Sequence, residues 1–171
     1  WWQRPEALEG NARRLRARGT SGAATARPDA LYAENWVTGS GVKRLQSAPK
    51  EQPGVRQVNV SGPHSPGDVT ESMRANVADR ACPDAVDCSF VAENREVRKS
   101  YAGMIENIDR KIGELIAAVE ERGELANTLF VYSADHGEMM GDHGFYEKTR
   151  PYQGSVHIPL VIDASHLGGV R

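Results

Sequence analysis

The chain has 171 residues, enough for one domain with a hydrophobic core. Apolar residues make up 39% and charged residues 26%, a balance typical of globular proteins that argues against a disordered or membrane-embedded chain. The formal net charge of −2 gives no support to nucleic-acid binding. No apolar run approaches the roughly 20 residues that span a bilayer, so we expect no membrane segment.

The cysteines and the two ends of the chain say little about its cellular setting. Cys82 and Cys88 are too few for a disulfide framework. They form either one local bridge or two thiols, and thiols are the favoured interpretation. The chain begins at Trp1 instead of Met and stops at Arg171, so we expect both ends to be truncated. The lack of a visible signal peptide therefore indicates no compartment, and nothing in the sequence indicates an oligomeric state.

Two helices are expected in the first part of the chain. Residues 5–18 fit a short surface helix, and residues 31–47 fit a longer one that is weakened by two glycines. The candidate buried positions of the longer helix are Tyr32, Trp36 and Leu45.

A strand and a loop are expected next. Residues 55–60 alternate in the manner of a short strand, and the Gly- and Pro-rich run 61–67 ends it in a loop. Residues 68–98 are polar and without clear periodicity, and we expect an irregular surface excursion there.

The strongest helical pattern runs from Ser100 to Arg122. Its apolar residues recur at three- and four-residue steps, which places them on one face, and charged residues fall mostly on the other. The apolar face is made of Tyr101, Met104, Ile105, Ile108, Ile112, Leu115, Ile116 and Val119. Gly123 stands where a helix C-cap belongs, so we predict that the helix ends there.

Two short apolar strands follow this helix. Residues 129–132 form a compact apolar run that leads directly into a polar segment, and residues 158–162 form a second run. This order of helix, strand, polar loop and strand predicts an α/β fold with a mostly parallel sheet flanked by helices. Ligands in such sheets bind beyond the carboxyl ends of the strands, which makes the polar segment after residue 132 the candidate site.

Asp135 and His136, at the start of that polar segment, are candidate metal ligands. A carboxylate oxygen beside an imidazole nitrogen suits Ca²⁺, Mg²⁺, Mn²⁺ or Zn²⁺, depending on what completes the shell. Gly137 follows and lets the backbone turn sharply. The alternative is that Asp135 caps a helix and His136 lies on the surface.

The wider segment resembles a known family. Residues 132–145 contain two Asp-His-Gly runs and resemble the metal-binding segment of the formylglycine-dependent sulfatases, in the alkaline phosphatase superfamily. The family pattern continues with a lysine, a Pro-Tyr-acidic step and an Ile/Val-Pro-Leu strand. Here these positions hold Lys148, Pro151-Tyr152-Gln153 and residues 158–162, with Gln153 where an acidic residue is commoner.

Upstream segments share the resemblance. Residues 57–66 resemble a family strand that ends in a Gly-Pro-His-x-Pro turn, and residues 101–128 resemble the helix before the metal segment. The resemblance is firm over residues 31–163. It implies that residues 1–171 are part of a sulfatase catalytic domain, with an alkaline-phosphatase-like α/β fold.

The resemblance also implies roles for four residues. Asp135 and His136 would bind a divalent cation, Ca²⁺ first and Mg²⁺ or Mn²⁺ as alternatives. Lys148 would contact a sulfate oxygen and the bridging ester oxygen, and His64 would hydrogen-bond the sulfate and protonate the leaving alkoxide. These types suit the reaction, because fixed positive charge stabilises the negative charge that develops on the leaving oxygen.

Simpler roles remain open for the same side chains. Lys148 can be a solvated surface charge, and His64, between two prolines, can shape a turn. His143 is expected to stabilise its loop instead of binding metal. Glu138 either orients the site or caps a turn.

The family's nucleophile is not present in this chain. It is a cysteine or serine, converted to formylglycine, in a Cys/Ser-x-Pro-x-Arg motif. Cys82 is followed at once by Pro83, and neither it nor Cys88 has an arginine four residues on. The aspartate pair that completes the family's metal site is also missing. We expect both upstream, and we expect the fragment alone to be inactive.

The resemblance implies hydrolysis of an organic sulfate monoester, with release of inorganic sulfate. A hydrated formylglycine would attack sulfur, the alcohol would leave, and the intermediate would then release sulfate. One alternative is a phosphomonoester, phosphodiester or phosphonate ester hydrolase of the same superfamily, and another is an inactive truncated relative. The substrate class would be a small-molecule or carbohydrate sulfate ester, and the sequence does not identify the alcohol.

Overall fold

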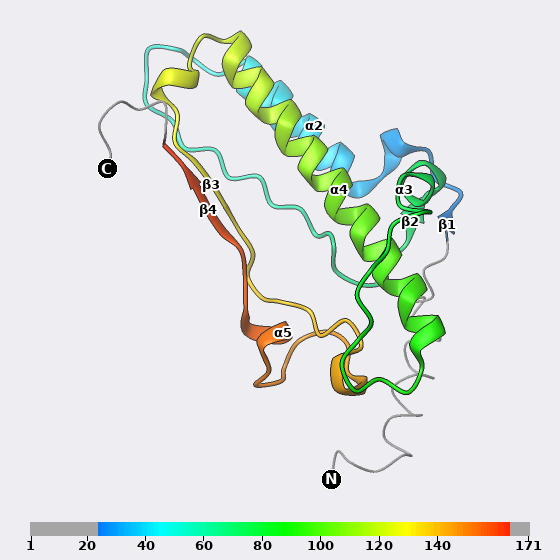
Figure 1. The fold of residues 1–171 in the computed structure, drawn as a ribbon. Coiled ribbons are helices and arrows are strands. Elements are labelled where there is room, and N and C mark those ends of the chain that lie inside the picture. Colours follow the sequence, from blue (N-terminus) through cyan, green and yellow to red (C-terminus); the bar gives the residue numbers. More distant parts are fainter. Residues whose placement is uncertain (1–23, 165–171) are drawn as a thin grey trace.

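The structure, a computed structural model, describes residues 24–164. Two packed helices form its longest layer (Figure 1). Helix α2 spans Ala33–Gln46 and helix α4 spans Val91–Glu121. The first confirms the helix predicted over 31–47. The second confirms the helix predicted from Ser100 but begins nine residues earlier. Residues 91–99 are good helix formers, but their sequence shows no apolar periodicity, so this first part of the helix was not predicted.

Polar side chains fill part of the contact between α2 and α4. Asn107 Nδ2 on α4 donates to Asn35 Oδ1 on α2 over 2.8 Å, and both side chains are buried. This face of α2 turns Trp36 outward, where it is 67% exposed, so the prediction that Trp36 is buried was wrong. Tyr32 is buried as predicted, and Leu45 is half-buried.

A small parallel pair of strands lies beside α4. Strand β1 (Ala24–Thr25) pairs in parallel with β2 (Val69–Thr70), and helix α3 (Glu71–Asn76) follows with Thr70 as its N-cap. Short 3-10 turns η1 (Asp29–Leu31) and η2 (Leu125–Asn127) precede α2 and follow α4. Residues 68–98 are therefore not an irregular excursion, because they contain β2, α3 and the start of α4. The hydrophobic core here consists of Tyr32, Val69, Met73 and Met104, with Tyr101 packed against it.

The second pair of strands leads to and from the candidate site. Strand β3 (Phe130–Ser133) pairs with β4 (Leu160–Asp163), with Val131 opposite Ile162. Both strands lie where they were predicted, but they pair antiparallel, because the chain returns by a loop instead of a crossover helix. Short elements η3 (Asp142–Gly144) and α5 (Gln153–Val156) lie in that return.

The strand predicted at residues 55–60 does not form. Within residues 24–164 this segment is extended without a partner strand, and it runs between the helices and the β3–β4 pair (Figure 1). It lies close to α2, because a Cβ atom on Gly41 would stand only 3.1 Å from Val58 Cγ2. The glycine that weakens α2 in the sequence thus allows this close approach.

The structure bears on the cysteines, on membrane segments and on the fold class. Cys82 and Cys88 are both free thiols, as favoured. In the described part of the chain, no helix is long and apolar enough to cross a membrane. The helix expected over residues 5–18 lies outside the described residues. The α/β class is confirmed, in the form of helices with two small two-stranded sheets.

Candidate functional site

Three predicted site residues meet in one cluster beyond the end of β3. Lys148 Nζ lies 3.0 Å from His64 Nε2 and 2.8 Å from His136 Nε2. The two imidazole rings face each other edge-on, with centroids 5.8 Å apart and planes at 76°. His64 comes from the loop after the extended segment, whereas His136 and Lys148 flank the loop after β3. The structure therefore brings these residues together from distant parts of the chain.

The hydrogen bonds of the imidazoles determine which nitrogen is basic. His136 Nδ1 lies 2.7 Å from the carbonyl oxygen of Gly137, and His64 Nδ1 lies 2.9 Å from that of Ser65. A carbonyl oxygen only accepts, so each Nδ1 carries the proton and donates it. Each Nε2 is then left with a lone pair directed at Lys148. The Lys148 ammonium thus donates to both imidazoles.

Asp135 and His136 lie side by side at the start of the loop after β3. Asp135 Oδ2 lies 3.9 Å from His136 Nε2, and the Asp135 side chain is 91% exposed. An exposed carboxylate oxygen and an unprotonated imidazole nitrogen are the donor types that divalent cations accept. Among residues 24–164, no third His, Cys, Asp or Glu completes a metal-binding group with them. The pair therefore offers two donor atoms, one oxygen and one nitrogen.

Tight packing explains the glycine that follows His136. The Gly137 N–H donates to Ser155 O over 2.8 Å, which joins the start of the loop to α5. A Cβ atom at Gly137 would overlap the carbonyl oxygen of Gly154 and stand 2.8 Å from that of His157. Only glycine allows α5 to lie this close to the backbone of the Asp-His-Gly run, so this glycine is required by packing.

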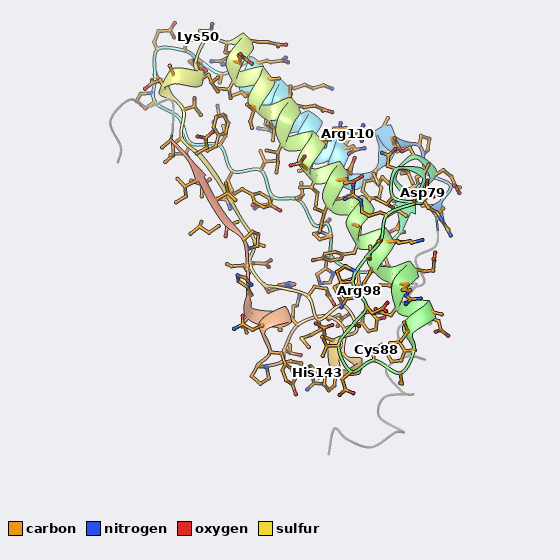
Figure 2. All side chains as sticks on the ribbon, viewed as in Figure 1. Lys50, Asp79, Cys88, Arg98, Arg110 and His143 are labelled. Carbon is orange, nitrogen blue, oxygen red and sulfur yellow. The ribbon has the colours of Figure 1, made fainter. Side chains whose placement is uncertain are left out.

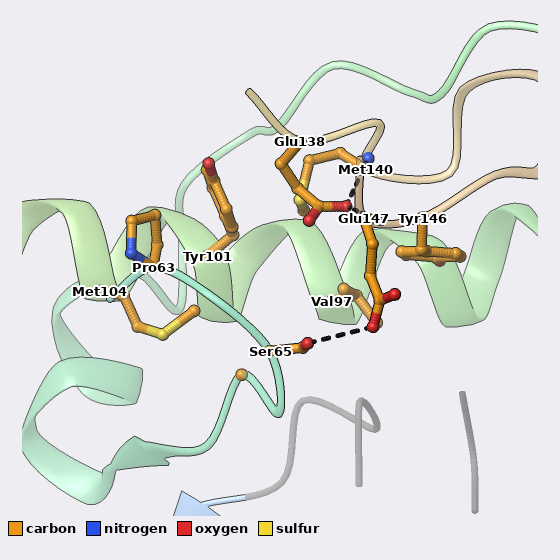
Figure 3. A pocket seen from close by; sticks show the side chains of 10 residues that line it. Pro63, Ser65, Val97, Tyr101, Met104, Glu138, Met140, Tyr146 and Glu147 are labelled. Atoms are coloured by element: carbon orange, nitrogen blue, oxygen red, sulfur yellow. Dashed lines mark hydrogen bonds between the residues drawn. The ribbon is translucent and has the colours of Figure 1, made fainter. Parts of the chain in front are cut away.

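Glu138 braces the loop that connects His136 to Lys148. Its Oε1 atom accepts hydrogen bonds from the backbone N–H groups of Met140, at 3.2 Å, and Glu147 (Figure 3). Met139 N–H donates to Glu147 O over 3.1 Å and closes the base of the loop. Burial raises the pKa of the Glu138 carboxyl, while the two N–H groups act in the opposite direction. The two hydrogen bonds that Glu138 accepts therefore fix the path of the loop.

A pocket lies next to Glu138. It is small and half-open, with a cavity volume of only about 20 Å³. Its walls come from the loop around Ser65, from Tyr101 on α4, and from Glu138 and Glu147 (Figure 3). The pocket therefore lies between the segment that carries His64 and the segment that leads into Lys148.

Two residues on α4 hold the outer side of the same loop, and sequence reasoning missed both. Asn94 is 1% exposed, and its Nδ2 donates to Met140 O at 2.8 Å and to Tyr146 Oη at 2.9 Å. Arg98 donates to Asp142 Oδ1 at 2.7 Å and to Met140 O at 3.0 Å. Figure 2 shows Arg98 near the loop that carries His143. Residues 91–99 lack apolar periodicity, so no signal in the sequence marked them.

The second Asp-His run is engaged in contacts of the loop itself. Asp142 Oδ1 accepts from Arg98 and from the N–H of Val86, at 3.0 Å. The His143 ring stacks on Tyr152 with centroids 4.7 Å apart, and its Nδ1 lies 3.7 Å from Asp87 Oδ2. These contacts are what a loop-stabilising pair would make.

Known proteins share this arrangement of segments. The sulfatase family model matches residues 26–168. An arylsulfatase of Clostridium perfringens (strain 13 / Type A) is 29% identical over 153 residues, which cover 77% of this chain and 32% of that protein. The chain thus spans about a third of the length of this relative.

Solved structures show the same fold. The phosphonate monoester hydrolase of Agrobacterium radiobacter has a TM-score of 0.74 at 23% identity, over 84% of this chain and 35% of that chain. BT4656, in complex with its substrate D-glucosamine-2-N,6-O-disulfate, has a TM-score of 0.69 at 15% identity, over 77% and 42%. The family match, the arylsulfatase relative and this common fold agree: the chain belongs to the sulfatase family of the alkaline phosphatase superfamily.

Proposed function

We propose that the protein containing this chain is a metal-dependent sulfuric ester hydrolase that releases inorganic sulfate from an organic sulfate monoester. The observation that carries the proposal is the cluster in which the Lys148 ammonium lies between His64 and His136, beside the Asp135 carboxylate. Membership of the sulfatase family supports the same activity. The cluster combines a fixed ammonium, a basic imidazole and a pair of cation ligands, which suits the transfer of a charged sulfuryl group.

The chain's own residues would act on the sulfate group and on the leaving oxygen. The Lys148 ammonium would bind a sulfate oxygen and the bridging ester oxygen, and so stabilise charge on both. His64 has a lone pair at Nε2, so it must gain a proton before it can protonate the leaving alkoxide. Lys148 Nζ, 3.0 Å away, donates a hydrogen bond to that nitrogen and keeps its positive charge for the sulfate oxygens, so the proton on His64 would come from solvent.

A divalent cation would complete the site. Asp135 and His136 would hold it through Oδ2 and Nε2, where the cation would replace the Lys148 ammonium at the His136 lone pair, and it would supply a further fixed positive charge for the sulfate oxygens. Ca²⁺ is the first choice from the family resemblance, with Mg²⁺ and Mn²⁺ as alternatives, since all three bind carboxylate oxygens. The formylglycine nucleophile would come from outside this chain.

The substrate class is proposed as a small-molecule or carbohydrate sulfate ester. The substrate of BT4656 is a sulfated glucosamine, which supports the carbohydrate class for a chain of the same fold. A phosphonate or phosphate ester is the second candidate, because the phosphonate monoester hydrolase shares the fold and the same cations can bind phosphoryl oxygens. An inactive truncated relative is the third.

The test is an assay of the protein with its upstream sequence, loaded with Ca²⁺. Release of inorganic sulfate from an aryl sulfate should be much faster than hydrolysis of matched phosphate and phosphonate esters. The upstream sequence should contain Cys/Ser-x-Pro-x-Arg. Preference for the phosphonate ester would support the second candidate, and no turnover of any ester with metal bound would support the third.

A further inference from the structure

Lys148 stands between two residues in a disfavoured backbone conformation. Glu147 has φ of 64° and Thr149 has φ of 77°, both in the left-handed region. Residues with a Cβ atom adopt this region rarely, and a β-branched residue such as threonine is an outlier there. Such a conformation persists only where the surroundings hold it, and it concentrates at functional sites. The position of the Lys148 side chain therefore depends on what holds its neighbours.

The contacts of Glu147 identify the group that holds it. Glu138 Oε1 accepts from the N–H of Glu147, and the Met139 N–H donates to the carbonyl oxygen of Glu147. Both backbone polar groups of the residue before Lys148 are thus fixed from one short stretch next to His136. Of these partners, Glu138 is the one whose contact is made by a side chain and can be removed by substitution.

Glu147 also connects to the segment that carries His64. Ser65 Oγ lies 3.4 Å from Glu147 Oε1 (Figure 3). The carbonyl oxygen of Ser65 accepts from His64 Nδ1. Glu147 is therefore linked through its backbone to Glu138 and through its side chain to the His64 loop. A shift of Glu147 would change the distance between Lys148 and His64.

We propose that Glu138 is a positioning residue for the sulfate-ester reaction: by holding the backbone of Glu147, it sets the Lys148 ammonium against His64 and the substrate. This inference rests on the proposed function. The hydrogen bonds of Glu138 go to the loop backbone, at Met140 and Glu147. Glu138 acts through the hydrogen-bond acceptor Oε1, so the geometry of an acceptor is required and the negative charge is not.

The experiment is a double-mutant cycle in the full-length, metal-loaded enzyme. Glu138→Ala should lower kcat by about 10², the cost of a small misplacement of a catalytic group. Glu138→Gln keeps the Oε1 acceptor and should stay close to the wild-type rate. In a Lys148→Ala background, Glu138→Ala should cost little more, because its effect passes through Lys148. Glu121→Ala, at the exposed end of α4, is the matched control and should change nothing.

A loss from Glu138→Ala that is equally large with and without Lys148 would overturn the inference, because the residue would then support the fold alone. If Glu138→Ala does not fold, the amide variant decides: a loss with Glu138→Gln as large as that of Lys148→Ala would overturn it.

A measurement independent of turnover separates this inference from the proposed function. Hydrogen exchange at the Glu147 and Met140 amides should be slow in the wild type and in Glu138→Gln, and faster in Glu138→Ala. Unchanged exchange in Glu138→Ala would show that the brace does not hold Glu147. A full rate in Lys148→Ala would instead defeat the proposed function, whatever the exchange shows.

Discussion

Lys148 Nζ and His64 Nε2 lie 3.0 Å apart, although 84 positions separate the two residues in the sequence. His64 accepts this hydrogen bond because its Nδ1 proton is committed to the carbonyl oxygen of Ser65. The ammonium therefore stands beside a basic nitrogen, with a second imidazole, His136, on its other side.

Loss of Lys148 or His64 should slow sulfate-ester hydrolysis without weakening metal binding. Lys148→Ala should lower kcat by about 10²–10³ on both alkyl and aryl sulfates, because its charge serves the transferring group and the bridging oxygen. His64→Ala should have the larger effect on alkyl sulfates, whose alkoxide needs a proton as it leaves. Values of kcat/KM on the two substrates measure this in the full-length enzyme. Equal and small losses on both would contradict the assigned roles.

Cation binding should depend more on Asp135 than on His136. Asp135→Ala removes a ligand and its negative charge, so the full-length protein should lose most of its affinity, whereas His136→Ala removes a neutral ligand and should weaken binding less. Calorimetric titration with Ca²⁺ and with Mg²⁺ measures both. Unchanged affinity in Asp135→Ala would show that this carboxylate has no part in a metal site.

Gly137→Ala should destabilise the protein, whereas Gly113→Ala should stabilise it. The added methyl group at Gly137 would overlap the carbonyl oxygen of Gly154, and such overpacking costs about 1–3 kcal/mol. At Gly113, in α4, a Cβ atom would meet nothing within 4 Å, and alanine favours the helix by about 1 kcal/mol. Urea denaturation gives the free energy of unfolding of both. A tolerated Gly137→Ala would mean that α5 packs less closely.

Asn94→Ala should loosen the loop that precedes Lys148. The substitution leaves the Tyr146 hydroxyl without this partner and removes one donor from Met140 O, at a cost of about 1–3 kcal/mol in the free energy of unfolding. Asn76→Ala, at the exposed end of α3, should change it by no more than about 0.5 kcal/mol. Chemical denaturation gives the free energy of unfolding of both variants. Equal effects would show that the Asn94 contacts do not stabilise the fold.

Tyr101 should ionise at unusually high pH. Burial, followed by the nearby charge of Glu138, raises the pKa of its phenol from 10.0 to about 12. Because the folded-state pKa lies above that of the unfolded chain, this contribution to stability is complete below pH 10.0 and is lost as the pH rises through about 12.

Phenolate absorbance during an alkaline titration measures this, with Tyr101→Phe to assign the transition. The variant should lose less stability than the wild type over that range, and Tyr152→Phe, whose ring is partly exposed, serves as the control. Ionisation of Tyr101 near the value of a free phenol would show that its ring is not held against the core.

Local patterns predicted much of this fold, because helices and single motifs depend on short-range information. The apolar period over residues 101–119 indicated α4, and the apolar runs near 130 and 160 indicated β3 and β4. The same patterns failed where a partner decides the outcome. Residues 55–60 have the alternation of a strand, but an extended segment becomes a strand only when another strand pairs with it, and none does within residues 24–164.

The sequence by itself determined which chemical groups are available: an Asp-His-Gly run after a strand, a lysine further along, and a histidine in a proline-rich loop. Only the tertiary structure decided that Lys148 lies between His64 and His136, and that Glu138 and Asn94 hold the loop on its two sides. The physical reason is the range of the interactions. Periodicity and turn chemistry act over a few residues, whereas these hydrogen bonds require α4, the extended segment and β3 to pack together first.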